Sequence, residues 1–274
     1  MADTEHISLV ELGLGDAPAG LLLSAEAHWN QNEADWRFFL SKGIMFGVRD
    51  RKQLVATAAL LPHSAGNAWI SMVLVTASWR RRGIATRLVD ACLNAATRLG
   101  LTTWLDATPD GAGVYGPLGF TPTLQLRRLR LEAPAGARAL RPLSACSPAE
   151  FIARDQRAMG FDRSALLKEF AGRGGSCMVS SGGAAALVRD GRTARQIGPL
   201  FADNHEDARA LVDAIVRSEQ GPWLLDAVHS QAEFLQGVTS AGWIIERPFQ
   251  RMRFGRTTML AAELPFAVAG PEFG

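Results

Sequence analysis

Three consecutive arginines, residues 80–82, stand directly before Gly83 and an amphipathic segment over residues 83–99. The apolar stretch 69–75 predicts a buried strand, so the arginines lie in a turn that leads from a strand into a helix. At a helix N-terminus several backbone N–H groups have no intrahelical partner and the helix dipole is positive. Three cations destabilise such an end unless an anion offsets them. We therefore predict a site for a multiply charged anion, such as a pyrophosphate.

Small residues in this turn allow a ligand to approach closely. Gly83 lets the backbone come near the anion, and Ala85 adds little side-chain volume. The segment has neither the G-x-x-x-x-G-K-[ST] pattern of a nucleotide P-loop nor the G-x-G-x-x-G pattern of a dinucleotide site. The structural alternative is that the arginines are solvated surface residues.

The composition limits the class of protein. With 274 residues, 47% of them hydrophobic, the chain suffices for one large domain or two small ones. It contains no apolar run of about 18 residues and no secretory signal pattern, so we expect a cytoplasmic protein without a membrane partner. A formal net charge of +2 argues against a general nucleic-acid binder.

Cysteine and histidine spacings do not indicate a metal site. Cys92, Cys146 and Cys177 are far apart and form no C-x-x-C pair, and the five histidines show no i, i+4 pairing. An odd and scattered cysteine set also argues against a disulfide framework. We predict free thiols and no metal.

The stretch EAPAGARALRPLSACSP (132–148) has the small residues and prolines of a linker and divides the chain almost in half. Periodicity predicts a similar order of elements on both sides of it. Before it we expect helices over 17–28, 33–41 and 83–99, a short helix near 111–119, and strands over 44–49, 53–62, 68–75, 101–108 and 121–131. After it we expect a helical region over 148–172, helices over 206–218 and 230–240, and strands over 177–181, 184–190, 193–202, 222–228 and 244–254.

Two short motifs recur at corresponding places in the two halves. Leu-Asp-Ala at 105–107 reappears at 225–227, and Gly-Phe at 119–120 reappears as Gly-Trp at 242–243. This recurrence indicates two copies of one α/β unit. Only the first copy has the arginine and glycine turn. At the corresponding junction the second copy has the sequence PLFADNHEDARAL. The apolar end LPFAVAGPEFG is expected to pack back over one domain.

The segment VTASWRRRGIATRL resembles the acyl-CoA-binding segment of the GCN5-related N-acetyltransferases (GNAT), whose signature is [QR]-x-x-G-x-[GA]. The later VYGPLGF resembles that family's tyrosine followed by Gly-Phe. Further stretches resemble a bacterial subgroup with two tandem acetyltransferase domains, the second of which lacks the CoA motif: HWNQNEADW, AWISMVLV, LDATP, GFDRSALL, QIGPL and RPFQRMRFG. The resemblance extends from about residue 23 to the end of the sequence.

The resemblance implies an α/β (α+β) fold of two tandem GNAT-like units, each a mixed, mostly antiparallel sheet flanked by helices. With the linker, it divides the chain into an N-acetyltransferase domain at 1–133, a linker at 134–147, a degenerate GNAT-like domain at 148–256 and a tail at 257–274.

The resemblance also implies acetyl-CoA as the cosubstrate. Its pyrophosphate is expected on the backbone N–H groups of residues 81–85, and its pantetheine arm is expected to pair like an extra strand with residues 73–75. The predicted acyl-CoA-binding residues are therefore Val73, Leu74, Val75, Arg80, Arg81, Arg82, Gly83, Ile84, Ala85 and Thr86.

Acyl transfer from a thioester to an amine needs a proton for the leaving thiolate. Tyr115 matches the tyrosine that donates this proton in the family, and it is the only tyrosine in the chain. A ring that caps the core beside Phe120 is the structural alternative. Asp106 ends a predicted strand nine residues earlier, and Asp110 lies in the loop that follows; either is a candidate general base or a ligand for a cationic acceptor. The recurrence of Asp106 as Asp226 favours a structural role.

In such enzymes the first two helices and their joining loop form the acceptor side, here HWNQNEADW. Asn30, Gln31 and Trp36 are the predicted substrate contacts. Trp29 and Trp36 lie seven residues apart, which is a helical spacing, so packing in the core is the alternative for both.

We therefore predict an N-acetyltransferase, monomeric or homodimeric, that moves an acetyl group from acetyl-CoA to a primary amine of a small molecule by direct attack in a ternary complex. No cysteine is well placed for a covalent intermediate. The first alternative is a CoA-binding sensor or interaction module without catalysis. The second is a phosphopeptide or nucleic-acid binder, whose affinity would fall steeply with salt.

Overall fold

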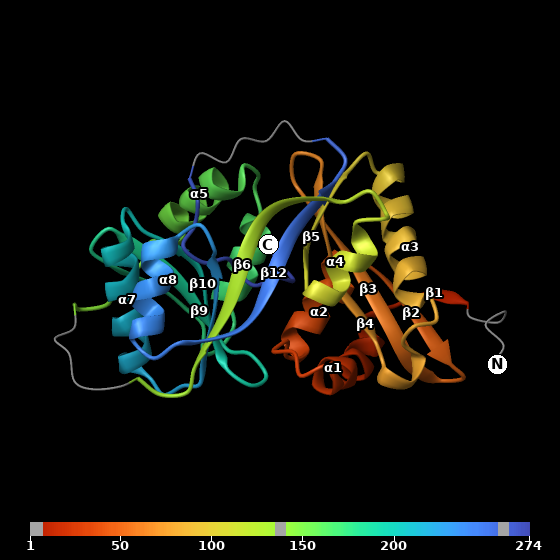
Figure 1. Ribbon diagram of the computed structural model, residues 1–274, viewed down its shortest axis with the longest axis horizontal. Coiled ribbons are helices and arrows are strands. Elements are labelled where there is room, and N and C mark those ends of the chain that lie inside the picture. The colour runs from red at the N-terminus through yellow and green to blue at the C-terminus, as the bar shows by residue number, and fades with distance from the viewer. Residues whose placement is uncertain (1–7, 135–140, 257–262) are drawn as a thin grey trace.

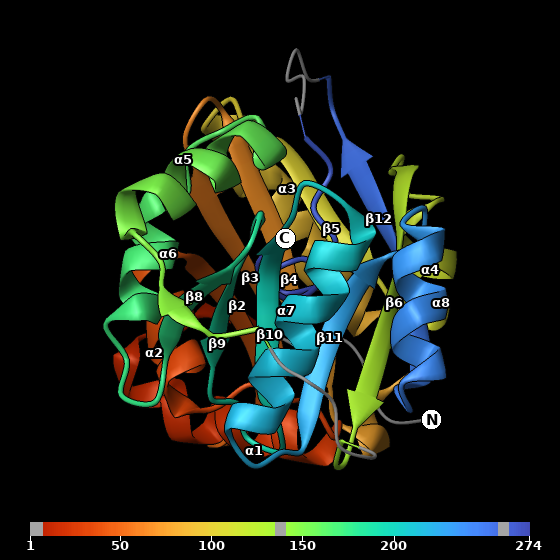
Figure 2. The same ribbon diagram turned by 90° about the vertical axis from the view of Figure 1, so that its left-hand side faces the viewer.

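The computed structural model describes residues 8–134, 141–256 and 263–274, and in these ranges twelve strands form one sheet with helices on both faces (Figures 1 and 2). The strand order is β1-β2-β3-β4-β5-β12-β6-β11-β10-β9-β8-β7. Parts of the predicted linker and tail, residues 135–140 and 257–262, lie outside the described residues.

The first half of the chain contains β1 (Leu9–Glu11), η2 (Leu14–Asp16), α1 (Ala17–Glu26), α2 (Glu33–Lys42), β2 (Ile44–Asp50), β3 (Gln53–His63), β4 (Asn67–Val75), η3 (Ala77–Trp79), α3 (Ile84–Arg98), β5 (Thr102–Ala107), α4 (Pro109–Tyr115) and β6 (Thr121–Leu131). The second half contains β7 (Ser144–Ala145), α5 (Pro148–Met159), α6 (Ser164–Ala171), β8 (Cys177–Ser181), β9 (Ala184–Arg189), β10 (Arg195–Phe201), α7 (His205–Ser218), β11 (Trp223–Val228), α8 (Ala232–Ser240) and β12 (Ile244–Phe254).

The expected helices and strands are confirmed to within a few residues, and the helical region 148–172 consists of two helices, α5 and α6. The edge strands β1 and β7 were not expected. They are three and two residues long, and so short a segment carries no alternation that periodicity can detect.

The last strand of each half pairs with the other half of the chain. β12 lies between β5 and β6, and β6 lies between β12 and β11. Figure 1 shows β6 and β12 running side by side across the middle of the molecule. Most pairings are antiparallel, and the exceptions among the described strands are β4 with β5 and β10 with β11. The two units therefore share one sheet, which sequence periodicity did not indicate.

In each copy of the repeated Leu-Asp-Ala motif, the aspartate pairs with an arginine on the last strand of the other half of the chain. On β5, Asp106 accepts two hydrogen bonds of 2.8 Å from Arg251 of β12. On β11, Asp226 accepts two hydrogen bonds of 2.8 Å from Arg128 of β6. Both carboxylates are fully buried. Each unit therefore supplies the counterion for an arginine on the last strand of the other.

The end of the chain enters the second unit and then the core between the two halves, and does not pack over one domain as expected. Ala267 bridges Leu200 of β10 and Ala227 of β11, so the segment 266–268 lies between these two strands. Beyond it Phe273 stacks on Phe39 of α2, with ring centroids 4.9 Å apart. The same buried cluster contains Phe170 of α6. The apolar tail thus fills the core that both halves share.

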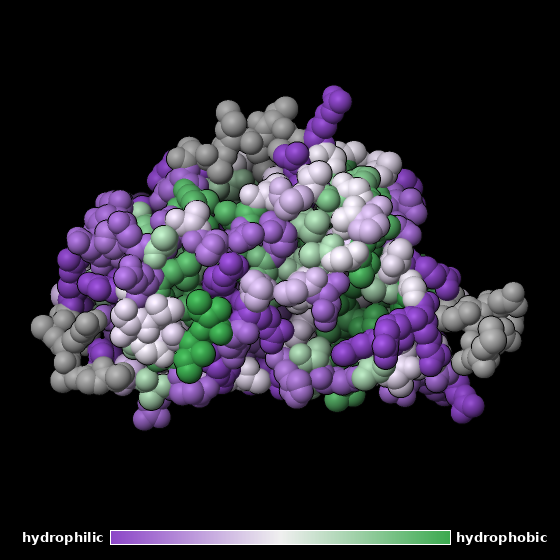
Figure 3. Space-filling model, viewed as in Figure 1, coloured by the Kyte–Doolittle hydropathy of each residue, from purple (hydrophilic) through white to green (hydrophobic). Residues whose placement is uncertain are grey.

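Hydrophilic and hydrophobic residues are interspersed on the face seen in Figure 3. Within the described ranges, no helix has the length and apolar character needed to cross a bilayer.

Candidate active site

Strands β4 and β5 separate beyond their first residues. Their parallel pairing is confined to Asn67–Trp69 with Thr102–Trp104. Further along β4, Met72 has a φ of 52°, and the register with β3 shifts between Thr57 and Ala59. Such a bulge bends a strand and redirects its backbone groups. As a result the β4 backbone over 73–75 has no strand partner on its β5 side among the described residues, and an extended ligand can pair there.

The turn before α3 leaves backbone donors free. Gly83 is the N-cap of α3 with a φ of 71°, and Arg81 also has a positive φ of 60°. No acidic residue lies in the first turn and no side chain caps it. In the described part of the chain the N–H groups of residues 83–86 have no acceptor. This is the arrangement that an anion completes.

Two of the three arginines also stabilise the loop. The Nε of Arg80 donates to the carbonyl of Val75 at 3.0 Å, and Arg82 donates to the carbonyl of Ser78 at 2.8 Å. The Arg82 guanidinium lies 4.7 Å from the centre of the Trp79 ring. The side chains therefore hold the turn in shape beside the free N–H groups, in addition to supplying positive charge.

In the second unit, the helix start and the gap between strands that correspond to these features are both occupied. At the start of α7 the Asn204 side chain accepts from the N–H of Asp207, and Glu206 and Asp207 lie in the first turn. Negative charge there repels an anion. The space between β10 and β11 holds the tail segment 266–268. Among the described residues, the start of α7 is therefore capped and acidic, and the strand edge that corresponds to the open edge of β4 is occupied.

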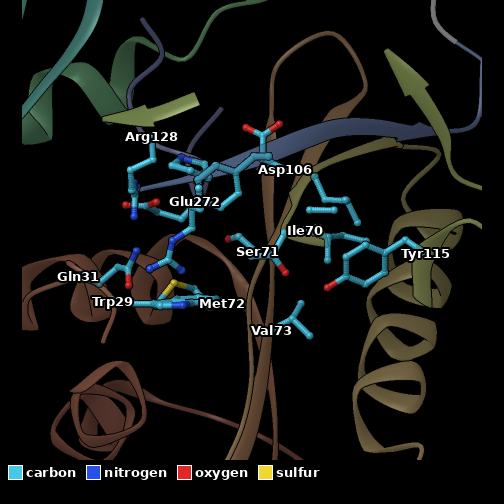
Figure 4. Close-up of a pocket in the computed structure, with 16 residues that line it drawn as sticks. Trp29, Gln31, Ile70, Ser71, Met72, Val73, Asp106, Tyr115, Arg128 and Glu272 are labelled. Atoms are coloured by element: carbon cyan, nitrogen blue, oxygen red, sulfur yellow. The ribbon is translucent and has the colours of Figure 1, made fainter. Parts of the chain in front are cut away.

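A pocket opens where β4 and β5 separate, and both halves of the chain line it (Figure 4). Its walls include four residues predicted to be functional: Gln31, Val73, Asp106 and Tyr115. The remaining lining residues are Trp29, Ile70, Ser71, Met72, Leu105, Ala107, Thr108, Arg128, Arg247, Phe249, Pro271 and Glu272. Sequence reasoning did not assign Arg128, Arg247 or Glu272 to the site, because no local pattern connects them to Tyr115.

Tyr115 is held at the C-terminal end of α4. Thr108 begins this helix, and its Oγ1 accepts from the N–H of Gly111 at 3.2 Å. The tyrosine ring packs near Phe120, with centroids 6.0 Å apart. Burial raises the pKa of Tyr115 to about 12, and the hydroxyl has no hydrogen-bond partner among the described residues. The side chain is therefore a neutral phenol with a free proton to donate.

Asp106 is part of the pocket lining, but both of its carboxylate oxygens are engaged by Arg251. Burial raises the pKa of Asp106, and the charge of Arg251 opposes that shift. The geometry gives this carboxylate a structural role in attaching β12 to β5. Its action as a general base stays a prediction.

We expect Asp106→Asn to lower the free energy of unfolding by about 3 kcal/mol or more, because it leaves Arg251 buried without a counterion. Denaturant titration measures this loss. Glu33→Gln is the matched control, since the Glu33–Arg37 pair is exposed and its loss costs less than about 1 kcal/mol. Equal, small losses for the two variants contradict the structural role of Asp106.

The structure brings one of the three predicted acceptor residues into the pocket. Gln31 lines it, whereas Asn30 and Trp36 do not. The Asn30 side chain instead joins the two halves: its Oδ1 accepts from the N–H groups of Thr193 and Ala194 at 2.9 and 3.0 Å. Trp36 is fully buried, as its packing alternative predicted. Trp29 lines the pocket in its place.

Neither a metal cluster nor a reactive thiol accompanies this pocket in the described residues. No group of three or more His, Cys, Asp or Glu side chains there is arranged to hold a metal ion. Cys92 is a free thiol on the buried face of α3, and burial raises its pKa to about 12. A thiol with so high a pKa is a poor nucleophile.

Comparisons with protein families give the class of this protein. A model of the acetyltransferase (GNAT) family matches residues 17–120, and a model of an acetyltransferase (GNAT) domain matches residues 152–264. The chain belongs to the GNAT acetyltransferases and contains two GNAT domains in tandem. The family and the fold class predicted from the sequence are confirmed.

Individual relatives resemble the chain over most of its length. An uncharacterized N-acetyltransferase of Bacillus subtilis (strain 168), YitH, is 24% identical over 220 residues, which cover 76% of this chain and 78% of YitH. A putative acetyltransferase from Pyrococcus horikoshii has a TM-score of 0.81 at 18% identity and covers 99% of this chain and 97% of its own. A tandem GNAT protein from the clavulanic acid biosynthesis pathway has a TM-score of 0.65 at 14% identity, covering 92% and 100%. At these identities the two solved structures show the fold alone.

Proposed function

We propose that the chain is an acyltransferase that moves the acetyl group of acetyl-CoA to a primary amine of a small molecule. The observation that carries this proposal is a succession of three features in the first unit. These are the uncapped N-terminus of α3, the unpaired edge of β4 and the pocket that contains Tyr115.

The residues present fit acetyl-CoA. A pyrophosphate on the free N–H groups of residues 83–86 is favoured by the helix dipole and by the arginines at 80–82. An extended pantetheine arm has amide groups that pair with the β4 backbone over 73–75. The thioester then lies toward the pocket, because Val73 is part of its wall.

The chemistry is direct transfer in a ternary complex. The amine nitrogen attacks the thioester carbonyl carbon, and backbone N–H groups near Val73 stabilise the negative charge on its oxygen. The carbon–sulfur bond then breaks, and Tyr115 gives its phenolic proton to the sulfur so that CoA leaves as a thiol. The proton that the amine loses passes to water or to Asp106, whose ion pair with Arg251 has to open for this.

The two units have different tasks in this proposal. The first unit binds acetyl-CoA, whereas the second unit is closed to it by the acidic start of α7 and by the segment 266–268. The second half contributes Arg247 and Glu272 to the pocket wall. It therefore acts as a scaffold that completes the acceptor side.

Isothermal titration with acetyl-CoA tests the proposal. We expect micromolar affinity and a stoichiometry of one acetyl-CoA per chain, followed by thiol release when a panel of small primary amines is supplied. Absence of binding rejects the proposal. A stoichiometry of two contradicts a closed second unit. Binding without thiol release from any amine supports the alternative, a CoA-binding sensor.

A further inference from the structure

Two arginines oppose each other in the wall of the pocket. Arg128 of β6 and Arg247 of β12 are register partners, and both line the cavity. Like charges directly opposite each other destabilise a strand pair. Asp226 neutralises Arg128, but Arg247 has no hydrogen bond or ion pair with any residue that the structure describes. One positive charge in the wall is left without a counterion.

The internal repeat shows that the fold does not require this second arginine. In the other half of the repeat, Arg251 pairs with Asp106 as Arg128 pairs with Asp226. The residue opposite Arg251 is Leu124. An apolar residue therefore satisfies strand pairing at the equivalent position. Arg247 appears only on the side that faces the pocket.

Further hydrogen-bonding groups at this end of the pocket lack partners. The Ser71 Oγ is buried and has no hydrogen-bond partner among the described residues. The Gln31 side chain is 3% exposed, and its one recorded contact is a long one, 3.5 Å from the Ser24 hydroxyl. Figure 4 shows Gln31, Ser71 and Arg128 around the same cavity. Buried polar groups are costly when unpaired, so this set indicates a ligand with acceptor oxygens.

A carboxylate of the tail lies in the same cavity. Glu272 is 7% exposed, and the Nη2 of Arg189 contacts its Oε1 at 3.3 Å. Burial raises the pKa of Glu272, although Arg189 and Arg128 oppose this shift. A buried carboxylate with one long contact gains from a further cationic partner. The pocket therefore has both a guanidinium group and a carboxyl group that are incompletely paired.

We infer that the acceptor is an amino acid or a similarly compact amine that also carries a carboxylate. Arg247, together with the unpaired Nη1 edge of Arg128, binds the carboxylate. Glu272 binds the ammonium group, which gives a proton to water before the nitrogen attacks the thioester. Trp29 and Phe249 form the apolar part of the pocket wall. A single uncompensated guanidinium matches one negative charge, which favours a carboxylate over a phosphate dianion. This inference rests on the proposed acetyl transfer and names its substrate class.

Thiol release measured on matched acceptors tests the inference. Each amino acid is compared with its α-amide and with the amine that lacks the carboxyl group. We expect the wild-type protein to favour the amino acid by at least about tenfold in kcat/KM. Arg247→Gln should raise KM for the amino acid at least about tenfold, leave kcat nearly unchanged and abolish the preference over the amide. Arg247→Lys should restore part of that preference, because it keeps the charge.

The controls separate this inference from loss of fold and from failure of the proposed function. Arg247→Gln removes an unpaired cation, so thermal unfolding should be unchanged. Arg253→Gln, on the same strand but outside the pocket wall, should retain the preference. Equal use of amino acid and amide by the wild type overturns the inference, as does activity restricted to amines without a carboxylate or to phosphorylated amines. Binding of acetyl-CoA without acetylation of any amino acid also overturns the inference. Absence of acetyl-CoA binding, in contrast, rejects the proposed function itself.

Discussion

Ala85→Asp is expected to weaken acetyl-CoA binding by at least about a hundredfold without lowering stability. Ala85 is the second residue of α3, among N–H groups that have no acceptor in the described chain. An added carboxylate occupies those donors and repels the pyrophosphate. At an effective dielectric constant near 20, two unit charges about 4 Å apart interact by about 4 kcal/mol, which exceeds the energy of a hundredfold loss.

The same carboxylate stabilises the helix by about 0.3–1 kcal/mol, because the dipole favours an acid in the first turn. Titration calorimetry with acetyl-CoA and thermal unfolding therefore separate loss of ligand from loss of fold. Ala85→Asn is the matched control: it has nearly the same shape without the charge and should lose less than about tenfold. Affinity of Ala85→Asp within threefold of the wild type means that the pyrophosphate does not bind at this turn.

Tyr115→Phe is expected to lower kcat by about a hundredfold or more and to leave acetyl-CoA affinity unchanged. The substitution removes the phenolic proton and keeps the ring that packs near Phe120. A well-placed general acid contributes about 10² to 10⁴ to a rate. Thiol release under saturating substrates gives kcat, and calorimetry gives the affinity. A kcat within threefold of the wild type means that another group protonates the thiolate.

The pH profile provides a second test of Tyr115. Burial favours the neutral phenol and places its pKa at about 12, so the proton is retained from pH 7 to about pH 10. We expect wild-type kcat to show no alkaline fall in that range. A fall centred near pH 9 contradicts this assignment. Phe120→Leu is the control, since it loosens the packing around the ring without removing a proton donor and should reduce stability more than kcat.

The exchange of β6 and β12 explains why the pocket depends on both halves of the chain. Each of these strands pairs with the other and with an inner strand of the opposite unit. Arg247 reaches the pocket of the first unit only because β12 lies beside β5 and β6. The tail has a similar double task, because it fills the space between β10 and β11 and then brings Glu272 into the pocket.

The sequence by itself predicted nearly all of the elements, the family and the turn that we propose as the anion site. Periodicity located nearly all helices and strands, and the turn from β4 to α3 could be recognised because its donors belong to consecutive residues. Tyr115 was identified from a local motif as well. Such features depend on short-range geometry, which a few neighbouring residues specify.

Only the tertiary structure decided which residues share the pocket. Strand alternation is the same whichever strand is the neighbour, so no pattern in 121–131 or 244–254 indicated that these strands are exchanged. The pairing of Asp106 with Arg251 joins residues far apart in the chain, and Asn30 proved to connect the two halves. Arg247 and Glu272 enter the site by the same long-range packing. Contacts of this kind are set by how the sheet and the tail assemble, and that information lies in no single segment of the sequence.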